Sequence, residues 1–428
     1  MEQQNVLSVN YADHLDATDP LKGFRERFVV DDQSMIYLDG NSLGRLPRVT
    51  AGRLNSVVNH EWGNRLIRSW NEGWYEQSSK CGRKLAQVIG AHPDEVIICD
   101  STSVNLYKLA YAALKLQKDR TEIISDDMNF PSDLYILQGL IKQFGNRHTL
   151  RLIKSSDGVN VEMHDLLRMM GKNTALVTLS HVAYKSSYLY DMKAVTELAH
   201  MEGALVIWDL SHSVGAVPLY LRNANVDFAV GCTYKYLNAG PGSPAFLYVR
   251  KDLQEKSESP LWGWFGQEDP FKFGMTYKPA KGIRRFLVGS PPLLSQSALE
   301  PALDITIEAG MKEIRKKSIS QTEYLIMLAK AWLIPSGFRL GSPVESQKRG
   351  SHVTLKHAEA FRICKALLDP ETGEGTVIPD FREPNNIRLG ITPLYTTYRE
   401  IYEAIRQMKD IVEGGLFKRF TRGKMSVT

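Results

Sequence analysis

The sequence predicts an α/β protein with a mostly parallel mixed sheet in a large domain and a smaller α/β C-terminal domain. Between residues 90 and 250, short apolar runs rich in β-branched residues alternate with helix-length amphipathic segments. This alternation is typical of a parallel sheet that is covered by helices on both faces. After residue 290 the pattern changes, and a chain of 428 residues is longer than one compact core usually serves.

The strands of the large domain are predicted from apolar runs that end in polar or glycine-containing turns. They cover Glu95–Cys99, Glu122–Ser125, Leu150–Ile153, Ala175–His181, Ala204–Asp209, Phe228–Thr233 and Ala245–Val249. The helical patterns between them include Val104–Leu116, Ser132–Phe144 and Met192–Met201. Because ligands of such sheets bind beyond the carboxyl ends of the strands, we expect the functional residues directly after the strands.

The C-terminal part begins with one long helical pattern, Ser295–Leu333, which would turn Glu300, Glu308 and Lys312 toward solvent. Short strands and two helices then follow, at Gly337–Arg339, Ser351–Leu355, Ala358–Leu368, Gly375–Pro379, Asn386–Ile391 and Tyr398–Ile411. We therefore expect three parts: an N-terminal segment, residues 1–75, that packs with the small domain; the large domain, residues 76–294; and the long helix with the small domain, residues 295–428.

Composition and charge exclude several classes of protein. Hydrophobic residues make up 43% and charged residues 24%, which excludes a disordered or collagen-like chain. The net charge is only +5, and no motif or long basic run favours nucleic acid. The N-terminus is polar and acidic, and no apolar stretch approaches the roughly 18 residues that span a bilayer. We therefore expect a cytoplasmic protein that binds no membrane.

The four cysteines are scattered, with no CxxC and no histidine at a zinc-binding distance in sequence, so we expect no metal site.

Two segments that follow the first strands carry hydroxyl and aromatic side chains. Asp100-Ser101-Thr102-Ser103 leads into a helix, where hydroxyls and free N–H groups suit a phosphate, although an ordinary helix cap is an alternative. Asn129-Phe130-Pro131-Ser132-Asp133 would place Phe130 over a planar ring at the sheet edge, with simple packing as the alternative.

Two later segments carry an acid and a lysine. Asp209, in the segment WDLSHS, could hold a protonated heteroaromatic nitrogen, with His212 supporting it; a structural Asp–His pair is the alternative. Lys235 directly follows an apolar strand and precedes the turn Gly240-Pro241-Gly242. A partly desolvated lysine there is prepared to form a Schiff base, although most lysines after strands are simply exposed.

The combination of these four features describes a pyridoxal phosphate site. The lysine binds the aldehyde, the aspartate keeps the pyridine nitrogen protonated, hydroxyls hold the phosphate, and an aromatic ring stacks on the cofactor. Their order along the chain resembles the fold-type-I, aspartate aminotransferase-like enzymes.

Within that superfamily, nearly the whole chain resembles the kynureninase family. The segments that carry the resemblance are YLDGNSLG (37–44), LIRSWN (66–71), STSVNLYK (101–108), NFPSD (129–133), WDLSHSVG (208–215), TYKYLNAGPG (233–242), GWFG (263–266), SPP (290–292) and NNIRLGITPLY (385–395). The resemblance implies hydrolysis of L-kynurenine, or of 3-hydroxykynurenine, to anthranilate or 3-hydroxyanthranilate and L-alanine, in tryptophan catabolism and the kynurenine pathway toward NAD biosynthesis.

The resemblance also implies a role for each site residue. Catalysis would involve Lys235, Asp209 and Tyr234, with Tyr234 as the acid–base group near the substrate carbonyl. The cofactor would be bound by Lys235, Asp209, His212, Thr102, Ser103, Phe130, Asp133, Ser180, Tyr234, Trp264 and Ser290. Trp264 and Ser290 would come from the second subunit of a homodimer with shared active sites. Arg388 would bind the substrate carboxylate, with a strand arginine paired with an acidic neighbour as the alternative. Trp62, Trp70 or Phe265 could contact the aryl ring, with core packing as the alternative.

Three alternatives stay open. Departures from the family pattern, such as Gln267 after GWFG, leave another ring-substituted kynurenine as the substrate. A class V-type aminotransferase would use the same lysine, aspartate and arginine, whereas a cysteine desulfurase needs a reactive cysteine and Cys364 lies in a helical pattern. A cofactor-binding protein that has lost its catalytic activity is the alternative of another class.

Overall fold

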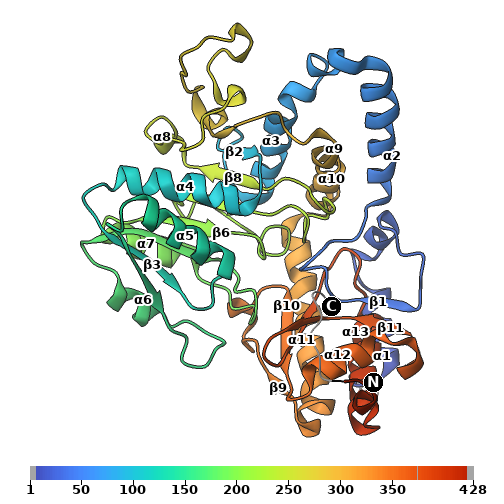
Figure 1. Ribbon diagram of the computed structural model, residues 1–428. Coiled ribbons are helices and arrows are strands. Elements are labelled where there is room, and N and C mark those ends of the chain that lie inside the picture. Colours follow the sequence, from blue (N-terminus) through green and yellow to red (C-terminus); the bar gives the residue numbers. More distant parts are fainter. Residues whose placement is uncertain (1–5, 374, 422–428) are drawn as a thin grey trace.

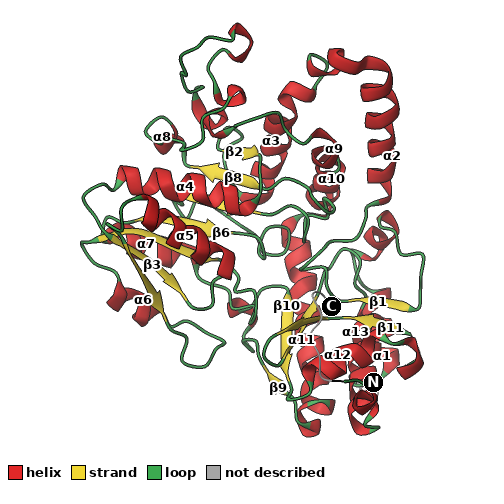
Figure 2. Ribbon diagram, viewed as in Figure 1, coloured by secondary structure: helices red, strands yellow, loops and turns green. Residues whose placement is uncertain are grey.

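The computed structural model describes residues 6–373 and 375–421 as a large lobe and a small lobe (Figures 1 and 2). The large lobe contains a seven-stranded sheet in the order β2-β8-β7-β6-β5-β3-β4. Only β8 runs antiparallel to its neighbours in this sheet. The predicted α/β class with a mostly parallel mixed sheet is therefore confirmed.

The predicted strands of the large lobe are present with small shifts at their ends. They are β2 (Val96–Ile98), β3 (Glu122–Asp126), β4 (Thr149–Ile153), β5 (Thr174–Ser180), β6 (Leu205–Asp209), β7 (Phe228–Gly231) and β8 (Phe246–Val249). The helices around them are α3 (Gln77–Ile89), α4 (Thr102–Leu116), α5 (Pro131–Gln143), α6 (Met163–Met169), α7 (Met192–Met201) and α8 (Lys251–Gln254).

Alternate residues of the strands fill two hydrophobic cores, one on each face of the sheet. Ile97 and Ile123 pack in one core with residues of α4 and α5, the two helices that lie over the near face of the sheet in Figure 1. Their neighbours Ile98 and Ile124 pack in the other core, which contains residues of α3, α6 and α7. This alternation explains the continuous apolar runs in the sequence, because both faces of each strand are buried.

The small lobe contains an antiparallel sheet in the order β12-β13-β10-β9 and a parallel pair, β1-β11. These strands are β1 (Met35–Tyr37), β9 (Arg339–Leu340), β10 (His352–Lys356), β11 (Thr376–Ile378), β12 (Asp380–Arg382) and β13 (Asn386–Gly390). The helices are α1 (Val9–Ala17), α11 (Met311–Trp332), α12 (Ala360–Leu368) and α13 (Tyr398–Glu413). The register of β12 and β13 places Asp380 opposite Arg388.

The N-terminal residues pack against the small lobe before the chain returns to the large one. Asp16 of α1 accepts hydrogen bonds from the N–H groups of Tyr398 and Arg399 at the start of α13. Strand β1 pairs with β11. Helix α2 (Arg48–Ser56) and the π-helical turn η2 (Val57–Arg65) then extend back to α9 and α10.

The prediction of a single long helix over Ser295–Leu333 is wrong. The structure has α9 (Leu293–Ser297), α10 (Leu299–Ala309) and α11 in its place. Pro301 has no N–H to continue the hydrogen-bond ladder from α9, and Gly310 has a positive φ of 75° that ends α10. Glu300 does not face solvent freely, because it pairs with Lys80 and Lys84 of α3 at 2.8 and 3.1 Å.

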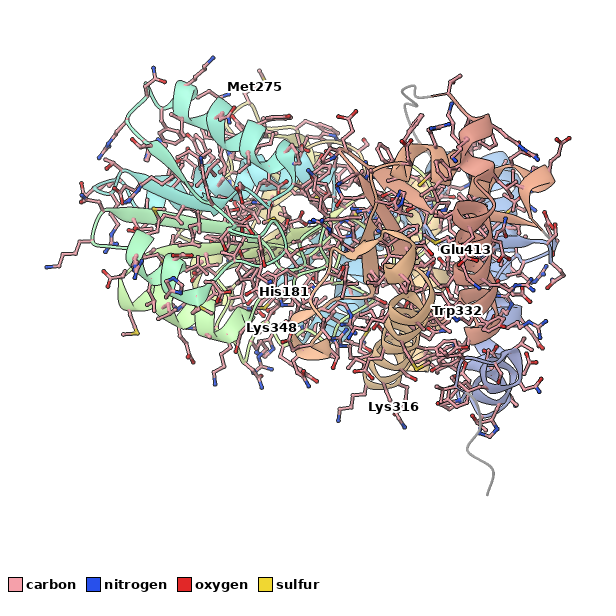
Figure 3. The ribbon with its side chains drawn as sticks, turned by 90° about the horizontal axis from the view of Figure 1, so that it is seen from below. His181, Met275, Lys316, Trp332, Lys348 and Glu413 are labelled. Atoms are coloured by element: carbon pink, nitrogen blue, oxygen red, sulfur yellow. The ribbon has the colours of Figure 1, made fainter. Side chains whose placement is uncertain are left out.

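The two lobes contact each other along the segment after β5. The N–H of Tyr190 donates to the carbonyl of His181, and the N–H of Leu189 donates to the carbonyl of Lys348 in the small lobe. Figure 3 labels His181 and Lys348 in the region of this junction, with Trp332 and Glu413 on the small-lobe side. In the described residues, no helix is both long enough and apolar enough to cross a membrane.

Candidate functional site

A cavity of about 550 Å³ lies at the carboxyl ends of the strands of the large sheet. It is formed by the turns after β2, β3, β6 and β7 and by the segment that enters β8. Its lining residues are Asp100, Ser101, Thr102, Ser103, Phe130, Ser132, Asp133, Asp209, Ser211, His212, Tyr234, Lys235, Gly242, Ser243, Pro244, Ala245 and Pro292. Eight residues predicted from the sequence therefore meet in one cavity: Thr102, Ser103, Phe130, Asp133, Asp209, His212, Tyr234 and Lys235.

Lys235 extends into this cavity from the turn after β7. Its Nζ lies 3.0 Å from Nε2 of His212. Burial and the nearby Lys235 hold the pKa of His212 well below its usual value, so the ring is neutral and accepts the hydrogen bond from the lysine. Tyr234 is half-buried, and burial raises its pKa, so its phenol keeps its proton.

Two buried carboxyl groups face the same cavity. Asp209 accepts hydrogen bonds from the N–H and the hydroxyl of Ser211 at 2.8 and 2.6 Å. Asp133 Oδ2 has no hydrogen-bond partner among the described residues. Burial raises the pKa of both groups, and Asp209 raises that of Asp133 further. Such a pair calls for a cationic or hydrogen-bond-donating ligand, and a protonated pyridine nitrogen meets this requirement.

Hydroxyl groups gather where α4 begins. The side chain of Ser101 caps α4 by accepting from the N–H of Val104 at 3.4 Å. The Ser103 hydroxyl lies 2.9 Å from that of Ser132, and Thr102 lines the cavity beside them. The free N–H groups and the dipole of a helix N-terminus favour an anion, so these residues fit a phosphate group.

Phe130 is held at the cavity by a small polar network behind it. Asn129 Oδ1 accepts hydrogen bonds from the N–H of Phe130 at 2.8 Å and from the hydroxyl of Ser180 at 2.7 Å. The Phe130 ring is 40% exposed and contacts the edge of the Tyr184 ring at 5.2 Å between centroids. Ser180 does not line the cavity itself, so within the chain it acts through Asn129.

Arg388 lies in the small lobe with only 2% of its surface exposed. Its guanidinium pairs with Asp380 and donates to the carbonyl of Tyr184 at 2.7 Å and to the hydroxyl of Ser42 at 2.8 Å. Its positive charge helps to lower the pKa of His212, as does that of Lys235. Arg388 thus lies near enough to His212 for its charge to act on that ring, although it does not line the cavity itself.

Besides Ser180 and Arg388, four more predicted site residues do not line the cavity within one chain. Trp264, in the turn η5 (Trp264–Gly266), is 39% exposed, and Ser290 and Trp62 are exposed as well. Phe265 is buried against Trp70 at 5.6 Å between ring centroids. Their predicted contacts with cofactor or substrate stay predictions.

Sequence reasoning missed Ser211, Ser243 and Asp380. Ser211 lies in the segment WDLSHSVG and Ser243 directly follows TYKYLNAGPG, so their position after the strands was the available signal. Asp380 had no such signal, because its contact with Arg388 arises from the pairing of β12 with β13.

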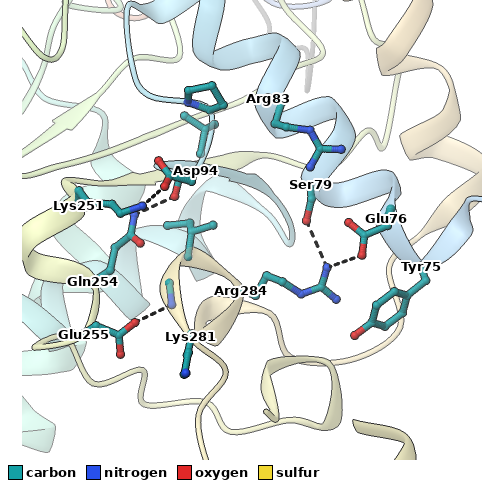
Figure 4. A pocket seen from close by; sticks show the side chains of 14 residues that line it. Tyr75, Glu76, Ser79, Arg83, Asp94, Lys251, Gln254, Glu255, Lys281 and Arg284 are labelled. Carbon is teal, nitrogen blue, oxygen red and sulfur yellow. Dashed lines mark hydrogen bonds and ion pairs between the residues drawn. The ribbon is translucent and has the colours of Figure 1, made fainter. Parts of the chain in front are cut away.

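A second hollow, of about 710 Å³, lies between α3, the start of β2, α8 and the turn η7 (Gly282–Phe286). Several of its charged side chains are paired: Arg284 contacts Glu76 at 3.1 Å, and Lys251 pairs with Asp94 (Figure 4). None of the site residues predicted from the sequence lines this hollow. Although it is larger, we therefore place the function in the Lys235 cavity.

Among the described residues, we find neither a reactive cysteine at the cavity nor a cluster of metal ligands. All four cysteines are buried, and none lines the cavity. Cys364 has no exposed surface in α12, and burial raises its pKa, so it cannot serve as the reactive cysteine of a desulfurase. Within residues 6–373 and 375–421, no group of three or more His, Cys, Asp or Glu could hold a metal ion.

Comparison with known proteins identifies the family. A family model for the kynureninase C-terminal domain matches residues 314–408. Kynureninase from Pseudomonas fluorescens is 43% identical over 404 residues, which cover 93% of this chain and 94% of the relative. The chain belongs to the kynureninase family.

Solved structures of low sequence identity share the fold. The apo cysteine desulfurase from Thermococcus onnurineus NA1 aligns with a TM-score of 0.78 at 20% identity, covering 92% of this chain and 98% of that one. A C-DES mutant with glycine covalently linked to its PLP cofactor aligns with a TM-score of 0.77 at 18% identity, covering 90% and 98%. The predicted fold-type-I architecture is thereby confirmed.

Proposed function

We propose that this protein is a pyridoxal phosphate-dependent hydrolase that cleaves L-kynurenine to anthranilate and L-alanine. The observation that carries the proposal is the arrangement of Lys235 with two buried carboxyl groups in the cavity of a kynureninase-family chain. The family relative supports the reaction, and the cavity residues fit the cofactor.

In this proposal, the cofactor binds along the carboxyl ends of the strands. Lys235 would hold its aldehyde, Asp209 and Asp133 would pair with its ring nitrogen, and Phe130 would stack on the ring. Thr102, Ser103 and Tyr234 bind the phosphate, while His212 and Ser180 support the ring side of the site. The buried and unpartnered Asp133 Oδ2 is the observation that best supports this placement.

We further propose a homodimer in which each cavity is completed by the partner's residues at positions 264 and 290. Trp264 and Ser290 are exposed and lie outside their own chain's cavity, which supports this assignment. The loop around Trp264 also exposes Phe271, Phe273 and Met275, and Figure 3 shows Met275 at the outer edge of the large lobe. Such an apolar loop is suited to a protein interface.

When bound, the cofactor supplies an electron sink for the negative charge that develops at the substrate's α-carbon. After the substrate's amine displaces it, the freed Nζ of Lys235 would accept the α-proton, and the neutral His212 ring, 3.0 Å from Nζ, would keep the amine oriented. Tyr234, whose pKa is raised by burial, donates its proton toward the γ-carbonyl oxygen as water adds there. Breaking the Cβ–Cγ bond would then release anthranilate. A proton delivered to the β-carbon and the return of a proton from Lys235 to the α-carbon would complete alanine.

Arg388 is proposed to bind the substrate's α-carboxylate, because a buried guanidinium forms charge-assisted hydrogen bonds with that group. Trp62 and Phe265 are proposed to contact the aryl ring, in a cavity completed by dimer formation. 3-Hydroxykynurenine or another ring-substituted kynurenine is the alternative substrate. An aminotransferase reaction is the alternative chemistry, because it uses the same lysine, aspartate and arginine.

The wider context is also a proposal. We place the enzyme in the cytoplasm, in tryptophan catabolism and the kynurenine pathway that can lead to NAD biosynthesis. We also propose that residues 76–294 act as the cofactor-binding domain, and that the N-terminal segment, residues 1–75, packs with the small domain within residues 295–428. The packing of α1 on α13 supports this division.

A product assay tests the proposed function. Purified protein with added pyridoxal phosphate is given equal amounts of L-kynurenine and 3-hydroxy-L-kynurenine, and alanine and both anthranilates are followed by mass spectrometry. Alanine with an excess of one anthranilate supports the reaction and reveals the ring preference. No alanine, together with consumption of an added 2-oxo acid, would favour an aminotransferase instead.

A further inference from the structure

Lys108 is a completely buried lysine that the proposed reaction does not use. It lies on α4 with none of its surface exposed. Its Nζ contacts Asp100 Oδ2 at 2.6 Å, the carbonyl of Phe286 at 2.6 Å and Cys99 Sγ at 3.6 Å. Buried ion pairs add little net stability compared with apolar packing, so stability alone does not explain a lysine at this position.

The partner of this lysine lies in the wall of the functional cavity. Asp100 lines the cavity immediately before the helix cap Ser101, and its side chain is 30% exposed. Its φ is +47°, in the left-handed region that Asp and Asn tolerate better than most residues. The N–H of Ala245 donates to its carbonyl at 2.8 Å, so its backbone is fixed as well.

Two buried side chains of α4 contact the residues that connect β2 to α4. Asn105, which is also fully buried, donates from Nδ2 to the carbonyl of Cys99 at 2.7 Å. Lys108 follows three residues later on the same face and reaches the side chain of Asp100. Asn105 thus fixes Cys99, which directly follows β2, and Lys108 fixes Asp100, which precedes Thr102 and Ser103 in the same turn.

The charge of Asp100 conflicts with the proposed role of this turn. A carboxylate in the wall of a phosphate site repels the phosphate and opposes the favourable dipole of the helix N-terminus. Lys108 brings a positive charge to Asp100 from beneath, without reaching the cavity itself, since it has no exposed surface. The ion pair therefore makes the turn neutral while Asp100 keeps its backbone conformation.

We propose that Lys108 is a positioning residue that neutralises Asp100 and thereby keeps the turn at Thr102 and Ser103 competent to bind the cofactor's phosphate. This inference rests on the proposed function, because it takes this turn as the phosphate site. The anion that it concerns is a phosphate monoester, and the loss of Lys108 should weaken binding only when that group is present.

The test compares pyridoxal phosphate with pyridoxal, which lacks the phosphate, in absorbance titrations of the apo-protein. Lys108→Met keeps a similar volume but leaves Asp100 without its counter-charge. We expect its affinity for pyridoxal phosphate to fall on the order of tenfold or more, with pyridoxal affinity unchanged. At saturating cofactor, kcat should stay near the wild-type value.

Two further variants separate charge from structure. Asp100→Asn removes the negative charge and still tolerates a positive φ, so its affinity for pyridoxal phosphate should equal or exceed that of the wild type. The double variant Lys108→Met/Asp100→Asn should regain most of the affinity that Lys108→Met loses. Lys115→Met, at an exposed position of the same helix, is the matched control and should change neither titration.

Several results would overturn the proposal. Equal losses for pyridoxal and pyridoxal phosphate would show a general structural role, and unchanged binding by Lys108→Met would show no role. If Lys108→Met does not fold, weaker binding of pyridoxal phosphate by Asp100→Asn alone contradicts the inference. A wild-type protein that binds neither compound would instead reject the proposed function.

Discussion

Replacing Arg388 with Gln should raise the KM for kynurenine about a hundredfold and change kcat much less. The wild-type guanidinium is buried and held by Asp380, Ser42 and the carbonyl of Tyr184, so it is fixed before substrate arrives. A charge-assisted pair with a desolvated carboxylate contributes about 3 kcal/mol, and each 1.4 kcal/mol is about a factor of ten. The fold should survive, because Asp380 keeps its 2.9 Å contact with Arg382 Nε.

The assay measures alanine release against the concentration of L-kynurenine and of its α-carboxamide. The wild type should prefer the carboxylate about a hundredfold, and Arg388→Gln should lose most of this preference. Arg382→Gln, at a more exposed arginine that contacts the same aspartate, is the matched control and should behave like the wild type. The reasoning is refuted if Arg388→Gln keeps a KM within about threefold of the wild type, or still prefers the carboxylate.

Three further predictions concern pH, subunit assembly and stability. Burial raises the pKa of Asp126 to about 6, above its ordinary value of 3.8. The folded state then binds this proton more tightly, so the free energy of unfolding falls by up to about 3 kcal/mol as pH rises from about 4 to 6. Asp126→Asn should flatten the dependence of Tm on pH over this range, and an unchanged slope would contradict the assignment. Trp264→Ala should speed the loss of cofactor during dialysis, and retention equal to that of the wild type would count against the shared site. Lys317→Met should lower the free energy of urea unfolding by about 3–5 kcal/mol, because it leaves Asp19 buried without its partner at 2.6 Å. The double variant Lys317→Met/Asp19→Leu should recover most of that loss, whereas a loss as large as that of the single variant would exclude the ion pair as its cause.

The large lobe could be predicted closely because its signals are local. Each strand is an apolar run buried on both faces, and a polar turn marks its end. Lys235, Asp209 and Phe130 follow such strands, so topology alone brings them to one edge of the sheet. The hydroxyls at the start of α4 were found for the same reason.

The remaining contacts depend on pairings that no local pattern contains. Asp380 meets Arg388 only because β12 pairs with β13 in one register. Ser180 was expected in the cavity, but it donates instead to Asn129, which then holds Phe130. Nothing in the sequence around Lys108 distinguishes it from an ordinary lysine in a helix. The role proposed for it rests on its burial and on its contact with Asp100. The break at Gly310 was missed because the helical periodicity continues across it.

The central claim is that Lys235 supports hydrolysis of the bond between Cβ and Cγ of kynurenine. Its most direct test follows the reaction in H₂¹⁸O, with the wild type and with Lys235→Ala, each supplied with pyridoxal phosphate. The account predicts equal amounts of alanine and anthranilate from the wild type, with oxygen-18 in the anthranilate carboxylate, and almost no product from Lys235→Ala. Undiminished product from Lys235→Ala, or turnover of kynurenine by the wild type without alanine, would contradict it.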